Sequence, residues 1–147
     1  QKMIDAILRE KAPEGFHGFL ILDMDHFKEV NDVYGHVMGD NVLRMLGGFL
    51  KEQFREQDVI GRIGGDEFVI LLCNIGSREN MESRIKNLHE NLREIRMEGM
   101  GEHTFTFSAG IAFAPQDGDT FMELYQKADL ALYQVKRSGR NGYRIYK

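Results

Sequence analysis

The chain has little of several features that define particular protein classes. A single cysteine among 147 residues excludes an internal disulfide bond and a cysteine-rich metal site. Positive charge is not in excess, because 23 acidic residues outnumber 19 lysines and arginines, which argues against a nucleic-acid partner. No apolar run approaches the roughly 20 residues needed to span a bilayer. The composition, 42% hydrophobic and 29% charged, predicts one globular domain over residues 1–147.

Two strand-like segments flank a pair of glycines in the middle of the chain. Residues 58–63 and 68–73 have the composition of strands, and Gly64-Gly65 between them predicts a tight hairpin. Asp66 and Glu67 then begin the second strand, where alternation makes their side chains point in opposite directions. That arrangement suits two carboxylates divided around a metal or a substrate. Taken alone, however, the pattern is more typical of an ordinary hairpin turn with solvated acids.

A second group of carboxylates follows a buried strand near the start of the chain. Residues 19–22 are apolar on both faces, as in a central strand covered on both sides, and they lead directly into Asp23 and Asp25. Carboxylates at the end of a buried strand are costly unless they have partners. We expect Asp25 to form hydrogen bonds that support the site, and not to bind a metal.

The remaining elements alternate between helices and strands. In chain order they are a helix over residues 1–10 ended by Pro13 and Gly15, a short helix that ends at Gly35, helices over 40–54 and about 81–95, a strand over 105–113, a helix from Thr120 to Gly139, and a strand over 143–146. Asp40 is a candidate N-cap of its helix. From the first strand on, the order is β-α-α-β-β-α-β-α-β. It predicts an α/β or α+β sandwich with a mixed sheet.

The acidic and basic residues define a possible site if they converge. Its members are Asp23, Lys28, Asp66, Glu67, Lys136 and Arg140. Mg²⁺ is usually bound by one or two carboxylates together with substrate phosphates, and lysine and arginine bind the remaining phosphate charge. The sequence therefore suggests metal-assisted phosphoryl or nucleotidyl transfer.

Five segments together resemble the successive motifs of the GGDEF family, the bacterial diguanylate cyclases. They are residues 23–32, 35–40, 62–68, 108–112 and 128–141, in that order. The resemblance implies a mainly antiparallel sheet flanked by helices, similar to adenylyl cyclase and polymerase palm domains. It also implies that two GTP molecules, each held by one subunit of a homodimer, are condensed into cyclic di-GMP and two pyrophosphates.

The resemblance also implies roles for individual residues. Asp23, the carbonyl group of Met24, Asp66 and Glu67 match metal ligands for Mg²⁺ or Mn²⁺, two ions per GTP, and Asp66 also matches the acid that activates the ribose 3′-hydroxyl. The matches to phosphate contacts are Lys28, Lys136, Arg140 and the amides of Phe27 and Lys28. Asn31 and Asp40 match the pair that binds guanine. Independently, a carboxylate can accept from guanine N1–H and the 2-amino group, which adenine lacks.

Arg55 and Asp58 match the family's RxxD inhibitory site for the product. An arginine and an aspartate at this spacing are able to bind a guanine edge and a phosphate. Outside this context the same pair is more often a solvated ion pair at a helix end.

Two other functions remain open from the sequence. One is a catalytically inactive receptor that binds cyclic di-GMP at Arg55 and Asp58, although the intact Asp66-Glu67 pair counts against it. The other is a palm-like polymerase, for which this acidic chain lacks a basic template channel. We expect a cytoplasmic domain from a longer protein, either free or membrane-anchored, with a sensory domain upstream.

Overall fold

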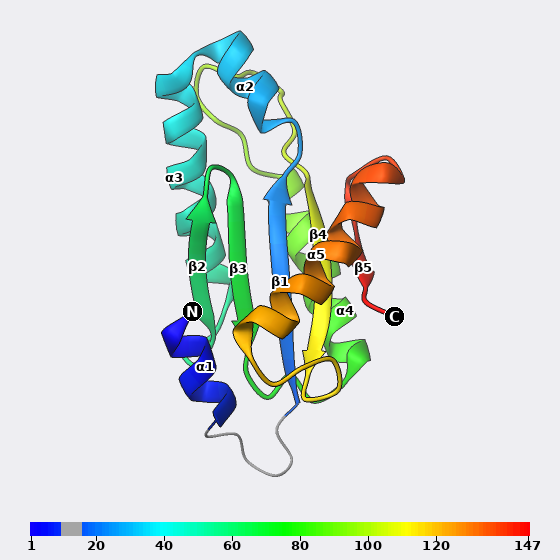
Figure 1. Ribbon diagram of the computed structural model, residues 1–147. Coiled ribbons are helices and arrows are strands. Elements are labelled where there is room, and N and C mark those ends of the chain that lie inside the picture. The colour runs from blue at the N-terminus through cyan, green and yellow to red at the C-terminus, as the bar shows by residue number, and fades with distance from the viewer. Residues whose placement is uncertain (10–15) are drawn as a thin grey trace.

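Strand β1 (His17–Met24) lies at the centre of a five-stranded sheet in the computed structural model, which describes residues 1–9 and 16–147 (Figure 1). The strand order is β2-β3-β1-β4-β5. β1 pairs antiparallel with both neighbours, and only the β4–β5 pair is parallel. The other strands are β2 (Val59–Gly64), β3 (Glu67–Leu72), β4 (Phe107–Ala114) and β5 (Gly142–Ile145). The predicted mixed, mainly antiparallel sheet is confirmed.

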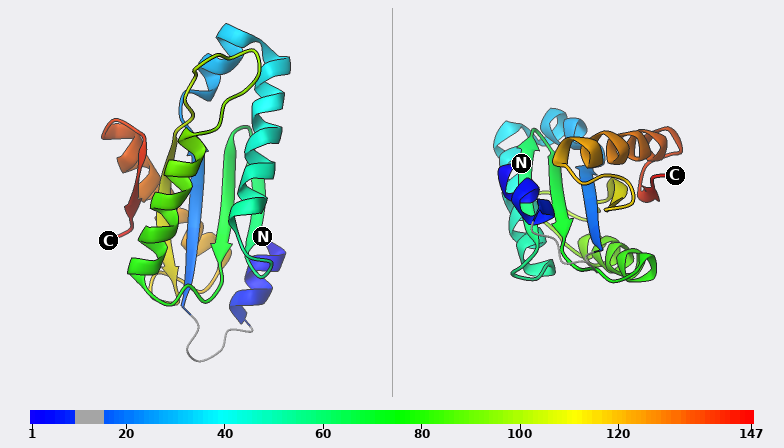
Figure 2. Two further views of the ribbon diagram at one scale, coloured as in Figure 1. Left: turned by 180° about the vertical axis from the view of Figure 1, so that it is seen from behind. Right: turned by 60° about the horizontal axis from the view of Figure 1, so that its bottom comes forward.

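Helices cover both faces of the sheet. They are α1 (Lys2–Arg9), α2 (Phe27–Tyr34), α3 (His36–Gln53), α4 (Arg78–Arg93) and α5 (Phe121–Arg137). α3 and α4 lie on one face, and α1 and α5 lie on the other (Figure 2). The predicted order of elements is confirmed, whereas Pro13 and Gly15 lie outside the described residues. None of the helices in the described part of the chain is long and apolar enough to cross a membrane.

Alternate residues of the central strand belong to two separate cores. Leu20 and Leu22 pack in the cluster that includes α3 and α4, whereas Phe19 and Ile21 pack in the cluster that includes α1 and α5. All four are fully buried, as a strand covered on both sides requires. The carboxyl end of this strand, which carries Asp23, is therefore anchored from both faces.

Two details of the secondary structure differ from the prediction. Helix α3 begins at His36 with Gly35 as its N-cap, four residues before the predicted start, so Asp40 lies inside the helix and its alternative role as the N-cap is excluded. Asp66 lies in the turn, and β3 begins one residue later at Glu67. The turn is tight because Gly65 adopts a φ of +50°, which is accessible to glycine.

Gly110 in β4 allows helix α5 to lie directly against the sheet. A Cβ atom at this position would lie 2.0 Å from the carbonyl oxygen of Ala128 and 2.6 Å from the amide nitrogen of Leu132. Both contacts are with backbone, so a side-chain rotation cannot relieve them. The position of α5, which carries predicted phosphate contacts, therefore depends on the missing Cβ.

We expect Gly110→Ala to lower the free energy of unfolding by about 3 kcal/mol, because α5 must move away from β4. Urea denaturation followed by circular dichroism measures this change. Gly61→Ala in β2 is the matched control, since its Cβ would meet nothing within 4 Å. Equal stability of the two variants would contradict the close approach.

Candidate active site

Asp23 is the residue around which the predicted catalytic groups gather. It lies directly opposite Glu67 in β3 and Ser108 in β4. Residues directly opposite each other in antiparallel strands have side chains on the same face. That face is covered by α5, from which Lys136 forms an ion pair with Asp23 Oδ2. The end of the central strand and the end of α5 are thus joined at one point.

Asp66 approaches the same carboxylate from the hairpin turn. Burial, a side-chain hydrogen bond with Asp23 and the negative charge of Asp23 together raise the pKa of Asp66 to about 6. The Met24 amide also lies 3.5 Å from the carbonyl oxygen of Asp66, which brings the turn beside the end of β1. The structure therefore brings together Asp23, Asp66 and Lys136, as well as the backbone of Met24.

Glu67 is held slightly apart from this pair. Its Oε1 accepts a 2.5 Å hydrogen bond from the hydroxyl of Tyr125 in α5. The carboxylate in turn raises the pKa of the Tyr125 hydroxyl well above its usual range. Among the residues that the structure describes, no group of three or more acidic, histidine or cysteine side chains is arranged as a metal cluster. Asp23 and Glu67 share one face of the sheet and Asp66 approaches from the turn, but the three carboxylates do not form a ready cage.

The donor atoms at the end of β1 nevertheless fit a divalent cation. Asp23 Oδ1 is buried and has no hydrogen-bond partner among residues 1–9 and 16–147. Burial and, to a lesser degree, the negative charge of Asp23 raise the pKa of Asp66, and a nearby cation would stabilise the ionised carboxylate against both. Mg²⁺ needs only one or two protein carboxylates, since it keeps several waters and binds substrate phosphates. Asp23 and Asp66 supply that number.

The first turn of α2 points free amides toward the same end of the sheet. His26, its N-cap, has a left-handed φ of +60° and makes no side-chain capping hydrogen bond. The first backbone bond of the helix joins the amide of Val30 to the carbonyl of His26. The preceding amides, including those of Phe27 and Lys28, are therefore not used inside the helix, and such amides bind anions such as phosphate.

The predicted guanine pair lies where α2 meets α3. Asn31 is on α2, and Asp40 is exposed in the second turn of α3. Between them, Gly39 is buried, and a Cβ there would lie only 1.8 Å from Asn31 Oδ1. The missing Cβ therefore lets the Asn31 side chain lie against α3, one residue before Asp40.

We expect Gly39→Ala to weaken guanosine binding about tenfold, because the new methyl group displaces the Asn31 amide and one or two hydrogen bonds to the base are lost. Isothermal titration with guanosine and with adenosine measures the effect and its base dependence. Gly48→Ala, later in α3, is the control because nothing lies within 4 Å of its Cβ. Unchanged guanosine affinity would contradict the role of this contact.

Arg140 follows the end of α5 in an unusual backbone segment. Gly139, Arg140 and Asn141 have φ values of +110°, +66° and +51°. The amide of Arg140 donates to the carbonyl of Val135, which closes the end of the helix. Arg140 is exposed and lies four residues beyond Lys136, so both predicted phosphate contacts belong to the same end of α5.

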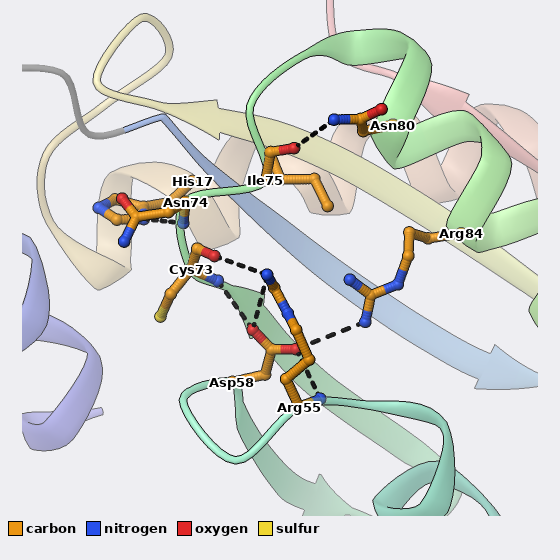
Figure 3. Close-up of polar contacts among 8 residues, drawn as sticks. All are labelled: His17, Arg55, Asp58, Cys73, Asn74, Ile75, Asn80 and Arg84. Carbon is orange, nitrogen blue, oxygen red and sulfur yellow. Dashed lines mark hydrogen bonds and ion pairs between the residues drawn. The ribbon is translucent and has the colours of Figure 1, made fainter.

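The predicted inhibitory pair is organised around a fully buried carboxylate (Figure 3). Asp58 accepts hydrogen bonds of 3.0 Å from the amides of Arg55 and Cys73, and Arg84 of α4 donates to it at 3.4 Å. Arg55 is fixed from two sides, since it lies 3.5 Å from Asp58 and donates to the carbonyl of Cys73 at 2.8 Å. Asp58 therefore positions two arginines, and it is these cations that reach solvent.

The family of this chain follows from comparison with known proteins. The family model described as "Diguanylate cyclase, GGDEF domain" matches residues 2–142. The chain belongs to the GGDEF diguanylate cyclase family. The expected resemblance and fold class are confirmed.

Individual relatives agree with this assignment. The probable diguanylate cyclase DgcC of Escherichia coli is 37% identical over 83% of this chain, and the diguanylate cyclase DgcS of Shewanella oneidensis is 34% identical over 99%. The solved GGDEF domain of TpbB (YfiN) from Pseudomonas aeruginosa superposes with a TM-score of 0.91 at 33% identity, covering 99% of this chain and 86% of that one. This GGDEF chain spans 33% of the length of DgcC and 47% of the length of DgcS.

Several residues of this GGDEF domain that touch the site were not predicted from the sequence. Tyr125 and Arg84 bond to predicted site residues across 58 and 26 positions of the chain. Both lie on helices whose sequence pattern indicates an apolar, core-facing side but gives no sign of a polar contact with the site. Gly39 could have been recognised from the sequence, because a glycine inside a helix is unfavourable unless close packing requires it.

Proposed function

We propose that this domain is the catalytic part of a diguanylate cyclase, which condenses two GTP molecules into cyclic di-GMP and two pyrophosphates. The observation that carries the proposal is the junction of Asp23, Asp66 and Lys136 beside the uncapped start of α2. It offers carboxylates for cations and amides and a lysine for phosphates within one site. The family assignment supports the same reaction.

Mg²⁺ or Mn²⁺, two ions per GTP, is the proposed cofactor. Asp23, the Met24 carbonyl, Asp66 and Glu67 would hold it, and the bound ions would neutralise the leaving pyrophosphate and make the attacking hydroxyl more acidic. The unpartnered Oδ1 of Asp23 supports this assignment. Glu67 would exchange its hydrogen bond with Tyr125 for this role.

The other predicted residues would position the nucleotide. The amides of Phe27 and Lys28, with the side chains of Lys28, Lys136 and Arg140, would bind the triphosphate. They surround one end of the sheet, so the phosphates would lie beside Asp23.

Asn31 and Asp40 would then bind guanine beyond the sheet, where α2 and α3 meet. Asp66 would accept the proton of the 3′-hydroxyl that attacks the α-phosphate.

A second copy of this chain is the proposed partner, because each half-site supplies one GTP and the attacking hydroxyl belongs to the nucleotide of the other subunit. Encounter of two subunits therefore controls the rate. We place the domain in the cytoplasm, as part of a longer protein in which a sensory domain sets the geometry of the dimer.

Incubation with GTP and Mg²⁺ over a range of protein concentrations tests this function. We expect cyclic di-GMP by chromatography, with a rate per subunit that rises with concentration until the dimer saturates. Before the assay, any bound product is removed by dialysis with a phosphodiesterase. Absence of cyclic di-GMP at every concentration would refute the cyclase.

The buried Asp58 network supports a second candidate, a receptor that binds cyclic di-GMP without making it. Arg55 is half-exposed and Arg84 is partly buried, and both guanidinium groups are fixed by Asp58; such groups bind guanine edges and phosphates in pairs. The receptor predicts tight binding of cyclic di-GMP with no turnover of GTP. In an active cyclase the same residues would form the inhibitory site.

A further inference from the structure

Asp25 is a buried carboxylate that the proposed reaction does not use. It directly follows β1, two residues after Asp23, and is only 7% exposed. A carboxylate removed from water costs several kcal/mol unless hydrogen bonds replace the lost hydration. A carboxylate buried at the end of the central strand therefore needs several hydrogen-bond donors.

Three donors from two distant segments satisfy this carboxylate. The hydroxyls of Thr106 and Ser108, at the start of β4, donate to Asp25 at 2.7 and 2.6 Å. The backbone amide of Asn141, beyond the end of α5, donates at 2.9 Å. The donors lie 81, 83 and 116 residues away along the chain, so Asp25 ties β1, β4 and the segment after α5 together.

The segment held by Asp25 is the one that carries Arg140. Arg140 and Asn141 both adopt left-handed φ values, which cost a residue with a Cβ about 1 kcal/mol or more each. Two backbone bonds fix this conformation, one from the amide of Arg140 to Val135 and one from the amide of Asn141 to Asp25. The Asn141 side chain also accepts from Arg93 at 3.4 Å, and Gly142 pairs with Ser108 of β4, but the Asp25 bond is the one that links this segment to the end of β1.

We propose that Asp25 is a positioning residue that fixes Arg140 relative to Asp23. The triphosphate is then able to contact the arginine and the site at the metal-binding carboxylate at the same time. Asp25 does not touch the substrate. It acts through the Asn141 amide, and the hydroxyls of Thr106, just before β4, and Ser108, within β4, hold it in place. The inference rests on the proposed function only in taking a nucleoside triphosphate as the ligand of Arg140.

Binding of a non-reacting GTP analogue and of guanosine to the intact chain tests the proposal. We expect Asp25→Asn to weaken analogue binding about tenfold, as loss of a charged hydrogen bond predicts, and to leave guanosine binding unchanged. A purely structural role would weaken both ligands alike. The amide of Asn141 is also expected to exchange its hydrogen faster in the free variant.

A double-mutant cycle identifies the residue through which Asp25 acts. In an Arg140→Ala background, Asp25→Asn should change analogue affinity less than twofold, because the side chain that it positions is gone. A tenfold loss in both backgrounds would overturn the proposal. So would faster exchange of the Asn141 amide with unchanged analogue affinity.

Thr106→Val provides a milder variant if Asp25→Asn does not fold. It removes one hydroxyl donor to Asp25, and we expect about a threefold loss of analogue affinity. Thr104→Val is its matched control, because the Thr104 hydroxyl donates to the carbonyl of Glu102 and not to Asp25. Equal effects of the two valines would overturn the proposal. A wild type that binds the analogue but makes no cyclic di-GMP would refute only the proposed function.

Discussion

Asp23→Asn is expected to lower cyclic di-GMP formation on the order of a thousandfold, because a cation-dependent site that loses a carboxylate loses several kcal/mol of transition-state stabilisation. The substitution keeps the size of the side chain, so the packing of β1 is preserved. It removes the charge that pairs with Lys136 and lies against Asp66. Chromatography of reactions with saturating GTP and Mg²⁺ measures the loss.

Binding of cyclic di-GMP distinguishes this loss from misfolding. Asp58 and Arg55 lie at a different site from Asp23, so product affinity by calorimetry should be unchanged in the variant. Loss of turnover and product binding together would instead indicate a damaged fold. Full activity of Asp23→Asn would refute the assignment of the metal site.

We expect Glu67→Gln, in the hairpin, to abolish turnover and to retain product binding. Chromatography and calorimetry measure the two effects, as for Asp23→Asn. The exposed Glu98 provides the matched control as Glu98→Gln.

Arg55→Ala is expected to weaken cyclic di-GMP binding at least about tenfold, because it removes a fixed cation that is able to bind the ligand bidentately. The buried Asp58 keeps its bonds to Arg84 and to the amide of Cys73, so the loop should remain folded. Calorimetry measures the affinity. Turnover assays with added cyclic di-GMP measure the inhibition, which should disappear.

The control for this substitution is Arg9→Ala, which removes an exposed arginine at the end of α1. Both variants should keep the initial rate of the wild type when no product is present. Inhibition of Arg55→Ala at the product concentration that inhibits the wild type would contradict the site. It would direct attention to cations elsewhere on the surface.

Most of the architecture follows from local patterns in the sequence. The apolar run at residues 19–22 predicts a strand covered on both sides, and Gly64-Gly65 predicts the hairpin, since each signal lies within a few residues. The error at Asp40 is also local. A carboxylate near a helix start resembles a cap, but α3 begins four residues earlier, at His36, and the choice depends on how α2 and α3 pack.

The site is less predictable than the fold because its contacts are long-range. Family resemblance selects Asp23, Asp66 and Lys136, and the structure brings these three together. The bond from Tyr125 to Glu67 has no signature in either local segment. Likewise, the sequence suggests that Asp25 forms hydrogen bonds, but its partners lie up to 116 residues away.

The close approach of Ala128 to Gly110 holds the middle of helix α5 against the sheet. Tyr125 lies three residues before Ala128, and Lys136 lies eight residues after it. These separations correspond to about 4.5 and 12 Å along the helix axis. A small tilt of α5 about Ala128 would therefore displace Lys136 nearly three times as far as Tyr125. A displacement of this one helix would therefore disturb the ion pair of Lys136 with Asp23 more than the hydrogen bond of Tyr125 with Glu67.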